Sequence, residues 1–408
     1  MESIREIFRI GNGPSSSHTM GPRKAALQFK EQNPMAGKYR VTLMGSLAAT
    51  GKGHLTDVAV REAFSPKTVE ILWKPEINLP FHPNALTFEA LNGEKSENRQ
   101  TVFSIGGGAL AYENDIVGEK PKSVYPLHFL SEIMEWCENN GKTYWQFVEE
   151  VEGDQIWDFL HEVWDTMKDS ISRGLSNEGT LPGSLKLARK ASSYYVKAKA
   201  YKGALKRRSM VYAYALAVAE ENAGGGKIVT APTCGSCGVL PTVLYLLYRY
   251  NDFSEPKILK ALATAGLIGN IVKHNASISG AKVGCQGEIG TACSMAAAAA
   301  TQLFGGTISQ IEYAAEMGLE HHLGLTCDPI AGLVQIPCIE RNAFAAARAF
   351  DCCTFAILSD GRHRVSFDKV VETMNRTGHD LPSLYKETSE GGLADRKSTR
   401  LNSSHRIR

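Results

Sequence analysis

Three of the nine cysteines lie where the backbone could bring a thiol close to a metal centre. Cys285 lies in VGCQGEIG, Cys327 in GLTCDPIAG and Cys338 in VQIPCIERN, each beside glycine or proline at an expected turn or helix end. The gaps between them fit neither a zinc knuckle nor the dense run of a bacterial ferredoxin. Three thiolates from separate helices could instead hold a [4Fe–4S] cluster whose open iron acts as a Lewis acid on a hydroxyl. A free cysteine is also often a small buried apolar residue, so spacing alone leaves both interpretations open.

A second set of reactive groups lies near the N-terminus, in NGPSSSHTMGP at 12–22. Ser15, Ser16 and Ser17 precede an expected helix and could simply cap it. A helix start rich in hydroxyl and N–H groups is also suited to binding a carboxylate. His18 beside it could exchange a proton near neutral pH. These residues by themselves favour neither interpretation.

The pair Cys234 and Cys237, in PTCGSC, forms a single CxxC motif. Such a motif after a strand resembles a thioredoxin-type redox site or half of a zinc site. The sequence has no second CxxC, and the adjacent Cys352 and Cys353 cannot share one helix face. The redox interpretation is therefore the weaker one.

The segment GSLAATGKGH at 45–54 comes close to a phosphate-binding loop but departs from it twice. It has one residue too many between Gly45 and Gly51, and Gly53 stands where serine or threonine should bind magnesium. We therefore expect no nucleotide site. A tight glycine loop that brings Lys52 or His54 near a small anion remains compatible with the pattern.

The elements that must position these groups change character along the chain. Strand-like runs at 40–44, 68–73 and 101–106 and a helix at 19–30 predict an α/β first part. Apolar residues three and four apart then predict helices from about 125 onward. We expect an α+β protein with an α/β domain at 1–150 and a helical domain at 151–394. The clearest helices are expected at 239–250, 256–273, 288–303, 308–318 and 341–358.

The overall composition is that of a soluble enzyme. There are 45 basic and 43 acidic residues, a net charge of +2, which argues against nucleic acid or a membrane surface as the main partner. The first ten residues lack the apolar core of a secretory signal, so we expect a cytoplasmic protein with reduced thiols. The uncharged stretch at 289–310 contains polar residues and glycines and predicts a packed helix rather than a membrane span.

The last fourteen residues, DRKSTRLNSSHRIR, have no apolar periodicity. A natural disordered basic tail would have this character. The segment also looks like the translation of a sequencing adapter, so we expect 395–408 to be non-native and leave it out of the fold.

Together, the motifs resemble the bacterial iron–sulfur-dependent L-serine dehydratases (L-serine ammonia-lyases), in a form with β and α parts fused in one chain. The matching strings follow the family's order: GNGPSSSHTMGPRKA, GSLAATGKGH, SIGGG, IVTAPTCGSCGVLP, GCQGEIGTACSMAAAA, LTCDPIAGLVQIPCIERNA and YKETSEGGLA. The resemblance implies an N-terminal domain like the allosteric substrate-binding domains and a helical domain that binds a [4Fe–4S] cluster. It implies Cys285, Cys327 and Cys338 as the cluster ligands.

The resemblance also implies a site between the two parts. It places Ser15, Ser16, Ser17 and His18 in the active site and implies contacts to L-serine from Thr19, Lys52, His54, Thr233, Cys234 and Gly235. Many relatives carry asparagine where this chain has Cys234, and they end in a cysteine-bearing tail that this sequence lacks. A homodimer is the family-like expectation.

The expected reaction is β-elimination of water from L-serine, which gives pyruvate and ammonia. The open iron would bind the β-hydroxyl, His18 would take the α-proton, and the serine hydroxyls would hold the carboxylate. No lysine lies in a recognisable context for pyridoxal phosphate, so we expect none. The alternatives are a related hydro-lyase or desulfidase acting on threonine or cysteine, and a serine-sensing module without catalysis.

Overall fold

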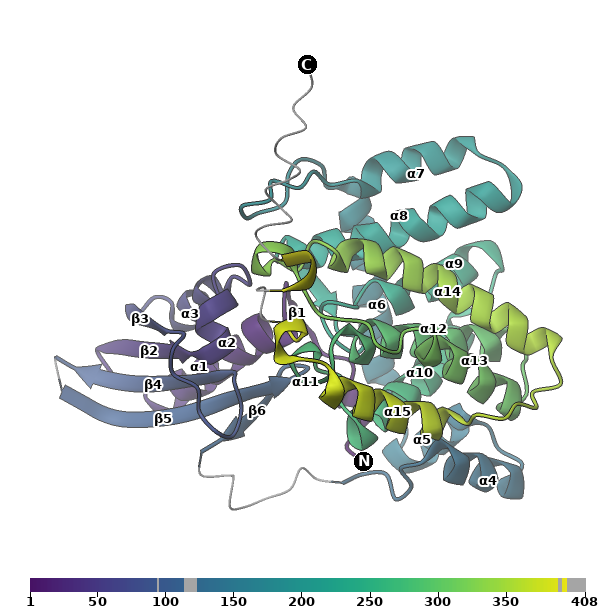
Figure 1. The fold of residues 1–408 in the computed structure, drawn as a ribbon, viewed down its shortest axis with the longest axis horizontal. Helices are drawn as coiled ribbons and strands as arrows, with labels where there is room; N and C mark the ends of the chain where they lie inside the picture. Colours follow the sequence, from purple (N-terminus) through teal and green to yellow (C-terminus); the bar gives the residue numbers. More distant parts are fainter. Residues whose placement is uncertain (94, 114–122, 388–390, 395–408) are drawn as a thin grey trace.

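The computed structural model describes residues 1–93, 95–113, 123–387 and 391–394, and it has a sheet part beside a larger helical part (Figure 1). The sheet has the order β3-β2-β4-β5-β6. Neighbours β2 and β3 are parallel, and the other neighbouring pairs are antiparallel. The strands are β2 (Lys38–Met44), β3 (Val69–Lys74), β4 (Ala85–Asn92), β5 (Lys95–Gly106) and β6 (Ala109–Tyr112).

Helices α1 (Gly21–Gln32) and α3 (Thr56–Phe64) pack on the sheet, while the short α2 (Gly45–Thr50) follows directly from β2. Their shared core is aromatic: the Phe29 ring stacks on Phe88 at 5.2 Å, and the Tyr39 ring stacks on Phe64 at 4.3 Å. Alternate side chains of β2 and β4 point into this core, as expected for strands with one buried face. The core holds the loops at the ends of β2 and α1 in place.

The helical part surrounds α12 (Ile289–Leu303), in which nearly every residue is buried. Its run of alanines lets α9, α10, α13 and α14 approach closely. The other helices complete the layers around it: α4 (Leu130–Asn140), α5 (Tyr144–Glu152), α6 (Gln155–Ser176), α7 (Ala191–Ala200), α8 (Gly203–Ala223), α9 (Val239–Tyr250), α10 (Glu255–Asn275), α11 (Gly280–Val283), α13 (Ile308–Glu320), α14 (Cys338–Leu358) and α15 (Phe367–Asp380).

The chain begins inside the helical part before it enters the sheet part. Ile4, Ile7 and Phe8 belong to the helical core, and β1 (Ile10–Asn12) pairs antiparallel with β7 (Lys227–Val229). The following residues then cross to α1. The serine-rich segment therefore lies at the junction of the two parts (Figure 1).

The α+β class is confirmed, and the strands expected at 40–44 and 68–73 and the long helices lie within a few residues of the observed ones, whereas β5 begins at Lys95 rather than at residue 101. The helix expected at 19–30 differs: Ser16–Met20 forms a π-helical turn, and α1 begins only at Gly21. The glycine loop expected at 45–54 is wrong in its first half, because residues 45–50 form α2. The expected boundary near 150 falls within α5 and stays a prediction, and residues 395–408 lie outside the described residues. In the described parts of the chain, every helix is too short or too polar to cross a bilayer.

Candidate active site

Hydrogen bonds within the sheet part fix the segment that carries His18. The Ser15 hydroxyl accepts from the His18 backbone N–H at 3.1 Å, as expected for a helix cap. Thr19 Oγ1 donates to the His54 carbonyl at 2.7 Å, and Thr56 Oγ1 donates to the His18 carbonyl at 2.6 Å. The two histidine-bearing segments are therefore tied together through their backbones.

The His18 imidazole is completely buried and has partners at both nitrogens. Its Nδ1 lies 3.0 Å from Ser17 Oγ, and its Nε2 lies 3.1 Å from Ser46 Oγ at the start of α2. The His54 ring lies 4.4 Å away. Burial, and then the neighbouring His54, hold the pKa of His18 well below its usual value, and burial lowers the pKa of His54 to about 4. Both rings are therefore neutral at physiological pH, and a neutral imidazole can accept a proton.

A group of metal-ligating atoms lies in the helical part, where α12 begins. Cys285 Sγ, Cys327 Sγ and a Glu288 carboxylate oxygen all lie within 4.8 Å of one another. Cys285 follows Gly284, whose φ of 76° turns the chain into the short helical turn before α12. Glu288 Oε1 accepts a hydrogen bond from Thr233 Oγ1 at 2.8 Å, and burial raises the pKa of Glu288.

Cys338 is the first residue of α14 and lies outside that 4.8 Å group. Burial and the nearby Cys285 thiol raise the pKa of Cys338, so the two sulfurs are electrostatic neighbours. Arg341, one helical turn later, donates to the Thr326 carbonyl at 2.7 Å and places its charge near both sulfurs. All three predicted ligands therefore come from turns or helix starts around one point.

Glu387 connects the cysteine group with the histidine group. Its backbone N–H donates to the Cys327 carbonyl at 2.8 Å, while its carboxylate Oε1 lies 4.0 Å from His18 Nδ1. Burial and the neighbouring Glu288 raise the pKa of Glu387 to about 8. Its φ of 60° is unusual for glutamate, and such backbone strain concentrates at functional sites.

The cysteine group fits an iron–sulfur cluster by the chemistry of its donors. Thiolates are the ligands that such clusters use, and Cys285 and Cys327 are only 3% and 4% exposed. The space beside them depends on a glycine: a Cβ on Gly280 would lie 3.0 Å from Cys327 Sγ and 2.7 Å from Glu288 Oε2. Closely spaced buried thiolates need positive charge to remain ionised, and the iron atoms of a cluster supply it.

The remaining predicted residues are divided between this site and its edge. Cys234 is buried, with Sγ 3.8 Å from Met20 Sδ and its thiol hydrogen-bonded to Ser16. The Gly235 carbonyl accepts from Asn342 Nδ2 at 2.7 Å. Lys52 is exposed, and its Nζ lies 5.6 Å from the centre of the Trp73 ring. Lys52 belongs to the lining of the pocket at the junction, but its ammonium group lies over Trp73 at the edge of the site.

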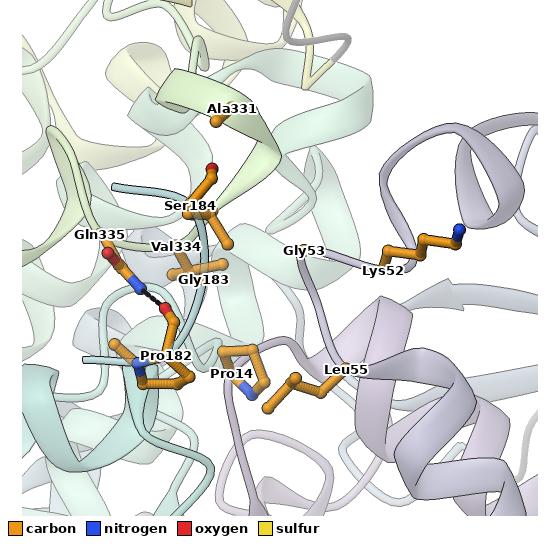
Figure 2. A pocket seen from close by; sticks show the side chains of 12 residues that line it. Pro14, Lys52, Gly53, Leu55, Pro182, Gly183, Ser184, Ala331, Val334 and Gln335 are labelled. Carbon is orange, nitrogen blue, oxygen red and sulfur yellow. Dashed lines mark hydrogen bonds between the residues drawn. The ribbon is translucent and has the colours of Figure 1, made fainter. Parts of the chain in front are cut away.

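A pocket of about 270 Å³ opens beside the site (Figure 2). Pro14, Gly53 and Leu333 line it. In the chain, Pro14 precedes Ser15, Gly53 precedes His54, and Leu333 lies between Cys327 and Cys338. Gln335 Nε2 donates to the Pro182 carbonyl at 2.6 Å across one wall. Figure 2 shows that the Lys52 side chain points away from this pocket.

Sequence reasoning missed three residues of this arrangement: Ser46, Glu288 and Glu387. Glu288 stands three residues after Cys285, the spacing that returns a helical side chain to the same face, and this was the available signal. Glu387 lies in the YKETSEGGLA string that marks the resemblance, but no local pattern distinguishes it. Ser46 looks like an ordinary residue in the first turn of a helix.

Comparisons with known proteins match two family models in succession along the chain, and the border between the two matches falls within the sheet. The family model "Serine dehydratase beta chain" matches residues 3–70, and "Serine dehydratase alpha chain" matches residues 84–394. The chain is 39% identical to L-serine dehydratase 1 of Escherichia coli (strain K12), over 97% of this chain and 99% of that protein. It is 41% identical to L-serine dehydratase of Streptomyces coelicolor, over 96% and 98% of the two chains. It is 40% identical to L-serine dehydratase of Mycobacterium tuberculosis, over 96% of this chain and 97% of that protein.

Proposed function

Because the chain belongs to the serine dehydratase family, with β and α parts in one polypeptide, we propose that it converts L-serine to pyruvate and ammonia. The observation that carries the mechanism is the position of Glu387, which is bonded to Cys327 and faces His18. The proton-transfer group and the thiol group thereby share one site. L-Serine would lose its α-proton and β-hydroxyl, giving water and 2-aminoacrylate, which tautomerises and hydrolyses to the products.

In this proposal Cys285, Cys327 and Cys338 hold a [4Fe–4S] cluster. When bound, the cluster supplies a Lewis-acidic iron that makes the β-hydroxyl a better leaving group. Glu288 lies between two of the sulfurs, and Thr233 fixes its orientation. Gly280 keeps the neighbouring space free of a side chain.

His18 is the proposed base. With its Nδ1–H directed at Ser17 and Glu387, the Nε2 lone pair is left to take the α-proton. Ser46 Oγ, 3.1 Å from Nε2, would move aside for the substrate or donate to it. Burial and Glu288 raise the pKa of Glu387 to about 8, so its carboxyl is largely protonated at neutral pH and would stabilise the protonated imidazole only once it has released its own proton.

The hydroxyl groups of Ser15, Ser16 and Ser17 would hold the substrate carboxylate, together with the amides of the turn that follows them. Thr19 positions this segment through its bond to the His54 carbonyl. Thr233, Cys234 and Gly235 would line the opposite wall. Lys52, exposed at the edge of the junction, would attract the anionic carboxylate from a distance rather than contact it.

The test is turnover by the full chain with an anaerobically reconstituted cluster. We expect pyruvate and ammonia in equal amounts from L-serine, and loss of activity on exposure to air. Relative kcat/KM for L-serine, L-threonine and L-cysteine decides between dehydratase and desulfidase chemistry. Serine binding without turnover in a cluster-loaded protein would overturn the proposal in favour of a sensing module.

A further inference from the structure

The turn between α7 and α8 projects from the helical part with almost no packing of its own. The first buried residue of α8 is Met210, so none of the residues 203–209 at its start is buried. In α7 only Ala191 and Ala198 are buried. Figure 1 shows this turn at an outer corner of the molecule. Because these helix ends bury so little against the protein's own core, most of their surface is free to contact a partner.

The segment around this turn is strongly basic, although the whole chain carries a net charge of only +2. Residues 181–219 contain nine lysines and arginines and no aspartate or glutamate. Three of the nine pair with acidic residues elsewhere in the chain: Arg189, Lys190 and Arg208. Four lysines at the turn have no acidic partner among the residues that the structure describes: Lys197, Lys199, Lys202 and Lys206. The near-neutral total therefore conceals a local excess of positive charge, and the expectation drawn from the total does not apply to this surface.

Apolar and aromatic side chains alternate with these four lysines. Val196 is 64% exposed, Leu205 is 58% exposed and Tyr201 is 41% exposed. Lysine stems can lie along such side chains while the ammonium groups reach toward anions. Lys199 does this within the chain, with its Nζ 4.2 Å from the centre of the Tyr195 ring. The turn therefore combines exposed apolar surface with positive charge on one projecting tip.

A pocket of about 270 Å³ lies at the base of this tip. Met210, Leu246 and Tyr250 contribute apolar surface to its lining, and Lys206 and Arg207 contribute positive charge. An apolar hollow beside an ammonium and a guanidinium group fits the upper part of an acyl chain that carries an anionic headgroup.

The composition of the tip favours a lipid surface over nucleic acid. An aliphatic side chain such as Leu205 gains from entering the acyl region of a bilayer, whereas contacts to a phosphate backbone are polar. Arginine is the residue most used to recognise nucleic acids. The two arginines at this turn, Arg207 and Arg208, already have side-chain partners within the chain. The groups left available are lysines and apolar side chains, which suit an anionic bilayer.

We propose that the turn between α7 and α8 docks on a negatively charged lipid bilayer. Leu205 and Tyr201 enter the interface, the four lysines contact the headgroup phosphates, and the helices stay folded. The opposite end of α8, at Ala223, lines the pocket beside the candidate active site. Because α8 has 21 residues, the tip lies about 30 Å from that pocket. The proposal therefore stands or falls independently of the reaction.

The test measures sedimentation of the full chain with lipid vesicles. We expect the wild type to bind vesicles of phosphatidylglycerol and phosphatidylcholine in equal parts, but not vesicles of phosphatidylcholine alone, and to bind less tightly as the salt concentration rises. Lys199→Glu/Lys202→Glu should weaken binding at least roughly 25-fold, because each lysine near an anionic surface contributes about fivefold. Leu205→Ser keeps every charge and should weaken binding roughly tenfold, because it removes the apolar anchor.

The matched control is Lys95→Glu/Lys369→Glu, which changes the net charge by the same amount at two exposed lysines elsewhere on the surface. It should bind the anionic vesicles as the wild type does. All three variants should keep the wild-type thermal midpoint, since the substituted side chains are exposed. Four results would each overturn the proposal: no binding of the wild type to anionic vesicles, an equal loss of affinity in the control, wild-type binding by Leu205→Ser, or tighter binding to single-stranded RNA than to the vesicles.

Discussion

Among the residues that the structure describes, two groups bring three metal-ligating atoms within 4.8 Å of one another, and they differ in almost everything else. One is the buried group of Cys285, Glu288 and Cys327. The other is the group of His161, Asp165 and Glu255 at the surface, where α6 meets the start of α10. Closeness of ligand atoms is therefore a weak criterion by itself, and the surroundings decide what each group can do.

The side chains of the surface group already pair with one another and with Lys168. Lys168 Nζ lies 2.8 Å from Asp165 and 3.2 Å from Glu255, and His161 Nε2 lies 2.9 Å from Glu255. An ammonium group thus occupies the place that a cation would take. Glu255 also lies in the first turn of α10, where the helix dipole favours negative charge.

The buried group has the opposite character. Its sulfurs are shielded from water, and Arg341, which bonds the Thr326 carbonyl and Asp328, also brings its charge to Cys285 and Cys338. Soft thiolates in a dry pocket bind iron–sulfur clusters, whereas hard oxygen and imidazole groups at a wet surface exchange their ligands with solvent.

The largest expected difference between the two groups is in iron content. Cys285→Ser should abolish cluster binding and lower turnover of L-serine by at least about 1,000-fold, because the Lewis acid would be lost. His161→Ala, its counterpart at the surface, should change neither. Iron, acid-labile sulfide and absorption near 400 nm measure the outcome. Equal iron content in Cys285→Ser and His161→Ala would contradict the proposed difference in iron binding between the buried and the surface group.

The next difference separates catalysis from cluster binding. His18→Asn removes the proposed base but leaves the cysteines intact, so iron content should stay at the wild-type level while kcat falls roughly 100-fold to 1,000-fold. The matched control is His161→Asn, an exposed histidine in the surface group. An unchanged kcat in His18→Asn would assign the proton transfer elsewhere, with His54 as the neighbouring candidate.

The same contrast shows what the sequence could and could not predict. The three cysteines could be selected because glycine or proline beside each marks a turn. In the structure Cys285 lies just before α12, Cys327 lies in the loop between α13 and α14, and Cys338 begins α14. The α+β class and the long helices followed from periodicity, since buried helices such as α12 have strong apolar patterns.

Glu387 could not be found in this way. It reaches the site because the backbone of residues 385–387 pairs with Cys327, a long-range contact that local spacing does not encode. Lys52 shows a second limit of local spacing. Its neighbours Gly51, Gly53 and His54 do lie at the junction, but its own side chain points out over Trp73. Sequence proximity located the loop correctly and gave no information about the direction of the side chain.

Because Glu312 is buried and Glu372 is exposed, we also expect the two glutamates to differ in their effect on the pH dependence of stability. The Glu312 carboxyl is 4% exposed and accepts from the Phe367 N–H at 2.6 Å, and burial raises its pKa to about 7. Because this folded-state pKa lies above the usual value, the protonated Glu312 carboxyl stabilises the folded state. This stabilisation is complete below about pH 4.5 and is lost as the pH rises through 7. The loss amounts to roughly 3 kcal/mol.

Glu312→Gln keeps the hydrogen-bond acceptor but cannot ionise, so the free energy of unfolding should vary less between pH 5 and pH 8 than in the wild type. Denaturant unfolding at several pH values measures this difference. Glu372→Gln is the control, because Lys369 and Arg376 lower the pKa of the exposed Glu372, which therefore stays ionised throughout this pH range. A variant with the same pH slope as the wild type would show that Glu312 is not the group that titrates.

The smallest effect tests whether the lysine or the exposure would oppose metal binding at the surface group. Lys168→Met removes the ammonium but leaves His161, Asp165 and Glu255 in place. We expect a stability loss of at most about 1 kcal/mol that shrinks at high salt, because the pairs are partly exposed and screened. We also expect no bound iron after reconstitution, since water still solvates the carboxylates and no thiolate is present. Iron bound at this group in Lys168→Met would mean that the two groups differ in iron binding because of the Lys168 ammonium, and not because of burial and sulfur ligands.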